Sequence, residues 1–195
     1  MTSNRILIAY ATRHGQARKV ADHLARELTL WGWPVIVADV ARTPAIDWPD
    51  YSAAILVASV YAGHHEKEMI AFVRRGHAAL DQMPNAFLSV MLAEATAEDR
   101  NVSESRRTEA ALAVKKVIDA FVEDTGWHPR QVLPVAGALL YRQYNFFIRF
   151  IMKRITKKQE GPTDTSRDYE YTDWAALSRF ASTFSRSLAQ PTKTA

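Results

Sequence analysis

The stretch Ile6–Val20, ILIAYATRHGQARKV, passes from an apolar segment through a polar turn into a helical pattern. The apolar and β-branched residues at its start are typical of a buried strand. From Ala17 to Leu28, apolar residues recur at three- and four-residue steps, which indicates an amphipathic helix that covers a sheet. A strand, a short turn and a helix in this order predict the first unit of an α/β fold.

The same alternation continues along the chain. The predicted strands are Arg5–Ala11, Pro34–Val40, Ser52–Ser59, Ala86–Leu92 and Gln131–Leu139. Helical patterns fill the intervals after the first, third and fourth strands, and a last helix is expected to begin near Thr172–Asp173. Strands that read as buried on both faces, joined by crossovers of sufficient length, favour a doubly wound, five-stranded parallel sheet.

Composition limits the class of protein. With 195 residues, 48% of them hydrophobic, the chain can bury a sizeable core, and we interpret residues 1–195 as a single domain. Because the chain has no cysteine, it cannot form a disulfide scaffold, a thiol nucleophile, a Cys-ligated zinc site or the usual iron–sulfur cluster. Neither a signal peptide nor an apolar run of membrane-spanning length is found, so a cytoplasmic protein is expected.

The turn after the first strand has the residues of a phosphate site. Thr12 offers a hydroxyl group, Gly15 permits backbone conformations closed to other residues, and a helix from Gln16 directs free N–H groups at the turn. The alternative is an ordinary corner in which Thr12 or Gln16 only caps the helix. The glycine-rich fingerprints of dinucleotide and nucleoside-triphosphate sites are absent from the sequence.

One interval is far longer than an ordinary loop. Between the fifth strand and the last helix lie residues 140–169, and a helical wheel from Arg142 to Lys158 is amphipathic. Its apolar side gathers Phe147, Ile148, Ile151, Met152 and Ile155, and its basic side Arg142, Arg149, Lys153 and Lys157. Such a helix suits an anionic membrane surface, or it packs on its own domain or on a second copy of the chain in a homo-oligomer. Nucleic acid is disfavoured, because the aromatic residues do not interleave with the charges.

Two resemblances are carried by these residues. The turn YATRHGQARKV resembles the phosphate loop [ST]-x-T-G-x-T of flavodoxins, which bind FMN on a five-stranded sheet of order 2-1-3-4-5, although His14 and Ala17 replace two threonines. The segments MPNAFLSVML, GALLYRQYNFFIRFIMKRI and GPTDTSRDYEYTDW are similar to the flavodoxin-like, menaquinone-dependent protoporphyrinogen dehydrogenases of bacteria. This second resemblance extends from Ile6 to about Leu188.

The resemblance implies a set of FMN contacts. The phosphate would lie on Thr12, Arg13, His14, Gly15, Gln16 and Ala17, and the flavin ring would meet Ser59, Tyr61, Gly63, His64 and the backbone of Val90, Met91, Leu92 and Ala93. Since the family pattern S-x-R-Y-G differs from Tyr61-Ala62 here, the identity of the stacking ring stays open. His14 either brings a positive charge to the phosphate or faces solvent. The histidines show no metal-ligand spacing, so no metal site is expected.

The resemblance also implies a function. FMN would carry electrons from protoporphyrinogen IX to menaquinone in haem synthesis, at the inner face of the cell membrane. Arg142, Arg149 and Lys153 are candidate partners of the porphyrin propionates, or else they contact membrane or solvent. The alternatives are a flavodoxin-type electron carrier, an NAD(P)H:quinone reductase, and a membrane-interaction module that has lost its flavin. The net charge of +4 fits a flavodoxin carrier poorly, because flavodoxins generally present acidic surfaces.

Overall fold

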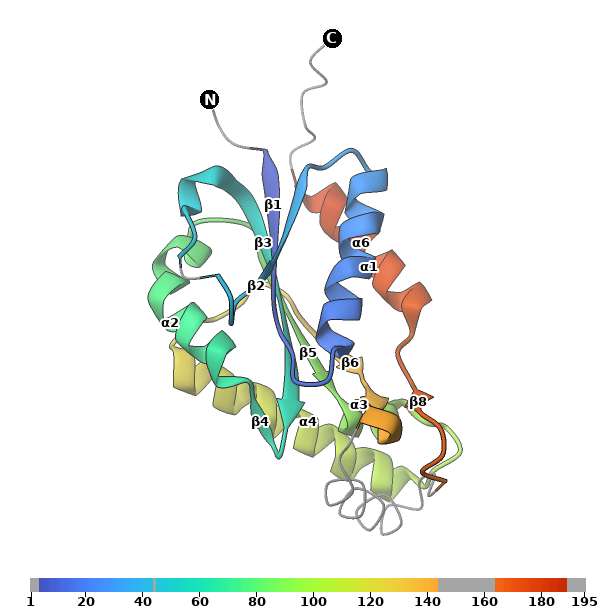
Figure 1. The fold of residues 1–195 in the computed structure, drawn as a ribbon. Coiled ribbons are helices and arrows are strands. Elements are labelled where there is room, and N and C mark those ends of the chain that lie inside the picture. Colours follow the sequence, from blue (N-terminus) through green and yellow to red (C-terminus); the bar gives the residue numbers. More distant parts are fainter. Residues whose placement is uncertain (1–3, 44, 144–163, 189–195) are drawn as a thin grey trace.

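Five apolar segments lie side by side as a parallel sheet in the computed structural model of this protein, which describes residues 4–43, 45–143 and 164–188 (Figure 1). The strands are β1 (Arg5–Ala11), β2 (Val35–Asp39), β3 (Tyr51–Tyr61), β5 (Asn85–Met91) and β6 (Val132–Ala136). Their order in the sheet is β2-β1-β3-β5-β6, and every neighbouring pair is parallel. The predicted five-stranded sheet of order 2-1-3-4-5 is therefore confirmed.

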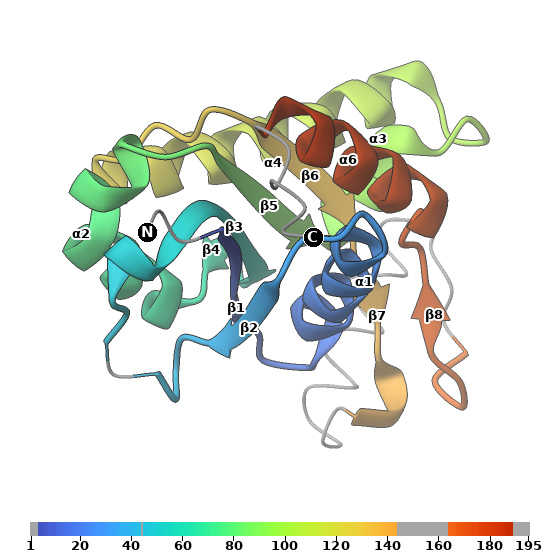
Figure 2. The same cartoon turned by 90° about the horizontal axis from the view of Figure 1, so that it is seen from above.

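Helices cover both faces of the sheet (Figure 2). On one face lie α1 (Gln16–Leu30) and α6 (Trp174–Ser187), and on the other lie α2 (Lys67–Asp81) and α4 (Glu104–Thr125). A 3-10 turn, η1 (Trp48–Asp50), precedes β3. The last helix begins where predicted, because the Asp173 carboxylate accepts a hydrogen bond from the Ala176 N–H at 2.8 Å and caps the helix.

Strand β1 has a continuously apolar sequence because it is buried on both faces of the sheet. Ile6, Ile8 and Tyr10 pack toward α1 and α6, whereas the alternate residues Leu7 and Ala9 pack toward α2 and α4. Every residue from Ile6 to Ala11 is buried. Fully burying a leucine or isoleucine side chain contributes about 1.5–3 kcal/mol, so this strand stabilises both layers of the fold.

The two edge strands depart from the prediction that all five strands are buried on both faces. Ile36 of β2 and Val132 of β6 each leave 42% of their surface exposed. Among the residues that the structure describes, each of these strands pairs with a neighbour on one side only. The apolar sequence of an edge strand therefore does not distinguish it from a central one.

The connection after β5 also differs from the expected loop. Leu92–Glu98 forms a short helix, α3, which packs against α4 and β6. Its sequence, LAEATAE, contains good helix formers but lacks the apolar spacing of an amphipathic helix, so the pattern does not reveal it.

The predicted fifth strand, Gln131–Leu139, is divided in the structure. Strand β6 ends at Ala136, and Ala138–Leu139 (β7) pairs instead with Tyr169–Glu170 (β8) in a separate antiparallel ribbon. A 3-10 turn, η2 (Tyr141–Gln143), follows, and Leu139, Leu140 and Tyr141 form a buried cluster of their own. This cluster draws the chain away from the main sheet and brings the two ends of the long interval together.

Most of the predicted basic helix falls outside the described residues. Arg142 lies in η2 with an exposed side chain, and its backbone N–H donates to Asp168 Oδ1 at 2.8 Å. Arg149 and Lys153 belong to residues 144–163, which are outside the described ranges. The amphipathic helix and its partners stay predictions.

Candidate functional site

The carboxyl ends of β1, β3 and β5 meet at one edge of the sheet, where ligands bind in open parallel sheets. A cavity of about 460 Å³ opens there, within the size range of small-molecule sites. Of the predicted site residues, it is lined by Thr12, Arg13, His14, Gln16, Ser59, Tyr61, Gly63, Val90, Met91, Leu92 and Ala93. The structure thus brings together residues from three loops that are far apart in the sequence.

Three of the predicted FMN contacts do not line the cavity. The Ala17 side chain is fully buried in the core between α1 and the sheet, so only its backbone can face the turn. His64 is exposed, because it follows the hairpin turn on the side opposite to its neighbour His65. Gly15 contributes its backbone conformation, which shapes the turn itself.

The turn after β1 is built by short-range contacts. The Gly15 N–H donates to Thr12 Oγ1 at 3.0 Å, which leaves the Thr12 O–H free to donate to another group. Gly15 adopts a left-handed conformation with φ of 87°, and a Cβ added there would meet no protein atom within 4 Å. The turn therefore holds open space at the start of α1.

The first turn of α1 suits an anion. The N–H groups of Gln16, Ala17 and Arg18 come before the first hydrogen bond of the helix, in which the Lys19 N–H donates to the Gly15 carbonyl at 3.1 Å. This turn carries the basic residues Arg18 and Lys19 and no acidic residue. The cap residue Gly15 has no side chain and so makes no side-chain cap to the N–H groups that follow it. A hydroxyl donor, free backbone N–H groups and the positive end of a 15-residue helix together form a phosphate-binding arrangement.

Arg13 points from this turn to the hairpin after β3. Its Nε and Nη2 donate to the two carboxylate oxygens of Glu66 at 3.3 and 3.2 Å. These hydrogen bonds raise the pKa of the Arg13 guanidinium above its ordinary value. Ser59 Oγ also donates to Glu66 Oε1 at 3.4 Å, so the buried carboxylate is shared by two loops.

The hairpin itself is tight and strained. Tyr61 pairs with His64 across a two-residue turn in which Ala62 has φ of 50° and Gly63 has φ of 82°. Ala62 is the one non-glycine residue with positive φ among those that the structure describes. An L-residue in this region costs about 1–2 kcal/mol, so the surrounding contacts must hold the turn in place. Positive φ at both positions is typical of a type I′ hairpin.

His14 lines the cavity beside Tyr61, with ring centroids 6.2 Å apart. Burial, followed by repulsion from Arg13, lowers the pKa of His14 below its ordinary value. This direction disfavours a positive charge on the His14 ring, whose side chain is half-buried.

The opposite wall of the cavity is apolar. Leu92 and Ala93 of α3 face it, as predicted, together with residues that sequence reasoning missed. The missed residues are Val60, Ala62, Ala113, Val117, Gly137, Ala138 and Leu140. Ala113 and Val117 are spaced four apart on α4, which signals a common helix face but not the cavity that this face meets.

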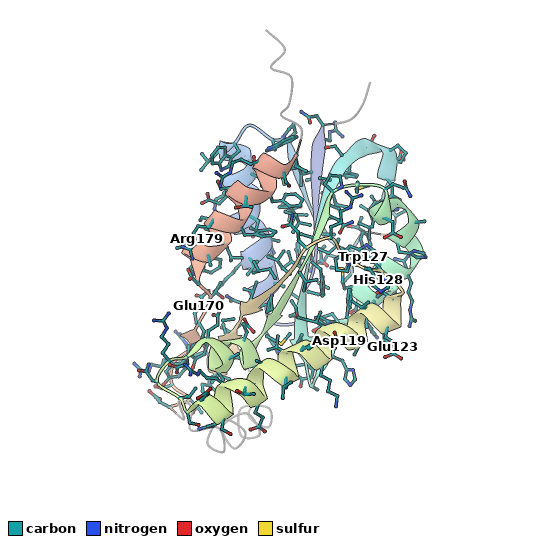
Figure 3. The ribbon with its side chains drawn as sticks, turned by 180° about the vertical axis from the view of Figure 1, so that it is seen from behind. Asp119, Glu123, Trp127, His128, Glu170 and Arg179 are labelled. Carbon is teal, nitrogen blue, oxygen red and sulfur yellow. The ribbon has the colours of Figure 1, made fainter. Side chains whose placement is uncertain are left out.

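Gln16 ties the turn to the chain that follows the long interval. Its Nε2 donates to Glu170 Oε1 at 2.7 Å and to Thr172 Oγ1 at 2.9 Å, and Thr172 Oγ1 in turn donates to the Ala136 carbonyl at 2.7 Å. Figure 3 marks Glu170 on the segment that leads into α6. These bonds anchor one end of the interval beside the cavity.

His65 is buried behind the hairpin. Its Nε2 lies 2.8 Å from Ser89 Oγ, and its ring packs against Phe87 and Phe121. Burial, with a smaller contribution from His64, lowers the pKa of His65 to about 4. A neutral imidazole here supports the hairpin and does not take part in the cavity.

A second hollow, of about 510 Å³, lies between α3, α4 and β6. It carries Glu94 and Glu98, and burial, followed by repulsion from Glu98, raises the pKa of Glu94 to about 6. Lys115 also lines this hollow but pairs with Asp119, so carboxyl groups outnumber cations there and the first cavity is the better candidate for an anionic ligand.

Comparison with known proteins agrees with this geometry. A family model described as "Flavodoxin domain" matches residues 7–166. Protoporphyrinogen IX dehydrogenase (quinone) of Escherichia coli K12 is 34% identical over 188 residues, which are 96% of this chain and 98% of that protein. The chain belongs to this flavodoxin-like dehydrogenase family. The protein of the same name from Leishmania major is 34% identical over 183 residues, 93% of this chain and 75% of that protein.

Solved structures of flavodoxins share the fold. A short-chain flavodoxin associated with a bacterial microcompartment has a TM-score of 0.53 at 16% identity, covering 95% of this chain and 99% of that one. The Streptococcus pneumoniae TIGR4 flavodoxin has a TM-score of 0.52 at 15% identity, covering 94% and 99%. Membership of the flavodoxin family confirms the prediction of FMN as the cofactor of an oxidoreductase. The turn after β1 fits its phosphate, because hydroxyl and backbone donors meet an open space there.

Proposed function

We propose that this protein oxidises protoporphyrinogen IX to protoporphyrin IX in haem synthesis, with FMN as the cofactor and menaquinone as the electron acceptor. The observation that carries the proposal is the similarity to dehydrogenases of that name over nearly the whole chain. The cavity supports it, since one end offers donors for a phosphate and the other offers an apolar wall.

Different residues of the cavity are proposed to bind different parts of FMN. Bound FMN would supply the redox chemistry, and because oxidation of a porphyrinogen to a porphyrin removes six electrons and six protons, three successive two-electron transfers to three quinone molecules would be needed. Thr12 and the N–H groups at the start of α1 hold the phosphate. Tyr61 stacks on the flavin ring, and the main chain of Val90–Ala93 meets the polar edge of the ring.

The apolar wall holds the reacting partners. Leu92, Val117 and Leu140 are among the apolar residues that line the cavity, and they come from α3, α4 and the chain after β7 rather than from the turn. Such a surface excludes water from the flavin and accepts an apolar face, which both the macrocycle of a porphyrinogen and the ring of a quinone present. The same surface orients one partner at a time against the cofactor.

Basic residues of the long interval, residues 140–169, are proposed to contact the substrate or the membrane. Arg142, Arg149 and Lys153 pair with the porphyrin propionates or with anionic headgroups at the inner face of the cell membrane. No helix of the described ranges is long and apolar enough to cross a bilayer. Attachment is therefore proposed to be peripheral, and stronger binding to anionic than to neutral vesicles tests it.

The function is tested by mixing FMN-loaded protein with protoporphyrinogen IX under anaerobic conditions, which prevent spontaneous oxidation. We expect porphyrin fluorescence to rise only when a menaquinone analogue is present. A protein that exchanges electrons with soluble redox partners but yields no porphyrin would be a flavodoxin-type carrier. Reduction of the quinone by NAD(P)H without porphyrin formation would identify a quinone reductase instead.

A further inference from the structure

Arg13 lies in the turn assigned to the phosphate, but its guanidinium group is directed elsewhere. Two of its five N–H groups donate to Glu66, which is only 8% exposed. Glu66 is itself held in place, because it stands at the N-cap of α2 and its backbone N–H donates to the Ser59 carbonyl at 3.3 Å. The fork of Arg13 is thereby held in one orientation.

That orientation places the guanidinium over an aromatic ring. The Arg13 Cζ atom lies 4.2 Å from the centroid of the Tyr61 ring. One face of this ring is therefore covered, and only the other face is left to stack on a ligand in the cavity that Tyr61 lines. Tyr61 stands directly before the strained turn at Ala62, so its position depends on contacts from outside the hairpin.

We propose that Arg13 is a positioning residue for the flavin ring: held by Glu66, it fixes Tyr61 so that the open face of the tyrosine stacks on the isoalloxazine. This inference rests on the proposed placement of the flavin ring against Tyr61. It assigns Arg13 to the ring end of the cofactor, although the residue stands in the phosphate turn.

Riboflavin, which lacks the phosphate, separates the two roles. Apoprotein is titrated into FMN and into riboflavin, and binding is followed by quenching of flavin fluorescence. We expect Arg13→Gln to weaken both ligands by the same factor, about 2- to 30-fold, the range of cation–π and aromatic contacts. A loss confined to FMN would make Arg13 a phosphate ligand and overturn the proposal.

Two further variants control for charge. Arg18→Gln removes the same charge from the first turn of α1, where Arg18 is exposed and pairs with Asp22 at 3.6 Å. It should leave riboflavin binding unchanged. Arg13→Lys keeps the charge but cannot make the forked contact, so it should also weaken riboflavin binding. Full recovery of both affinities in Arg13→Lys would contradict a positioning role.

A double-mutant cycle tests the connection to Tyr61. In a Tyr61→Leu background, Arg13→Gln should have no further effect on riboflavin, whereas an undiminished loss would overturn the proposal. The Arg13→Gln protein could fail to fold because Glu66 is left without its cation. In that case the double variant Arg13→Gln with Glu66→Gln takes the place of Arg13→Gln in the same cycle. Failure of the proposed oxidation would leave flavin binding, and this result, intact. A wild-type protein that binds neither flavin would overturn both proposals.

Discussion

The turn after β1 and the hairpin after β3 face the same cavity but are held by different kinds of contact. The turn is closed by a hydrogen bond between residues three apart, Gly15 and Thr12. The hairpin depends on Arg13, which is 53 residues from Glu66, and on Ser89, which is 24 residues from His65. The backbone of the phosphate turn is thus closed locally, although Gln16 also ties it to Glu170 and Thr172, whereas the hairpin is held mainly by residues distant in the sequence.

This difference predicts how each region responds to change. A substitution in the turn alters the binding of ligand while the sheet and its covering helices stay intact. A substitution behind the hairpin alters the free energy of unfolding, because the groups that hold it are buried among the core residues Phe87 and Phe121.

The largest effect is expected at Gly15. Gly15→Val forces a β-branched residue to φ of 87° and places its side chain in the open space assigned to the phosphate. We expect FMN affinity to fall by more than about 100-fold in a protein that is still folded, as measured by fluorescence titration and far-UV circular dichroism.

Gly32 offers a matched control for Gly15. It has the same φ of 87°, and a Cβ added there would likewise meet no protein atom within 4 Å, but it lies at the other end of α1. Gly15→Val and Gly32→Val should each reduce the free energy of unfolding by about 1–2 kcal/mol, because both force a left-handed conformation on valine. Gly32→Val should do so without loss of FMN. Equal loss of FMN in both variants would mean that strain, rather than the phosphate site, explains the result.

A smaller effect is expected at Thr12. Thr12→Ala removes the hydroxyl group that donates to the phosphate and should cost about 1.5–3 kcal/mol of FMN binding, the range for a hydrogen bond to a charged group. Thr12→Ser keeps the hydroxyl and should bind nearly as well as the wild type. Isothermal titration of the two variants measures the difference, and equal affinities would remove Thr12 from the site.

The smallest effect concerns the hairpin and depends on pH. The pKa of His65 is about 4 in the folded protein, below the ordinary value of 6.5, so the unfolded chain takes up a proton first as pH falls. The neutral His65 therefore has its full effect on stability above pH 6.5, and this effect is lost as the pH falls toward 4. At pH 5 the free energy of unfolding should be lower by about 2 kcal/mol.

Urea unfolding at pH 7.5 and pH 5 measures this loss. His65→Gln should reduce the difference between the two conditions by about 2 kcal/mol. The neighbouring exposed residue gives the control, since His64→Gln should change the difference only slightly, because it removes only the smaller of the two causes of the shift in the His65 pKa. If the two variants behave alike, the hairpin is not supported by a neutral buried imidazole.

The central sheet could be predicted from the sequence because its signal is local. Alternating burial of Ile6 and Leu7 on opposite faces produces a continuous apolar run, and the spacing of Ala17, Val20 and Leu24 marks the helix that covers it. The order of strands came instead from the resemblance to flavodoxins, since each strand reads alike in isolation.

The rest of the site depends on distances that no local pattern contains. Glu66 looks like an ordinary first-turn carboxylate, and only the fold shows that it receives Arg13. Leu140 reads as part of a long loop until β7 pairs with β8 and brings it to the cavity. The apolar wall was missed for this reason, whereas the turn around Gly15 could be predicted.

The central claim is that FMN binds in the first cavity with its phosphate on the turn after β1. Titration of ¹⁵N-labelled apoprotein with FMN tests it most directly, through the backbone amide shifts. We predict the largest changes at residues 12–17, 61–63 and 90–93, with little change at Gly32. Changes centred instead on the hollow between α3, α4 and β6, around Glu94 and Val132, would contradict the account.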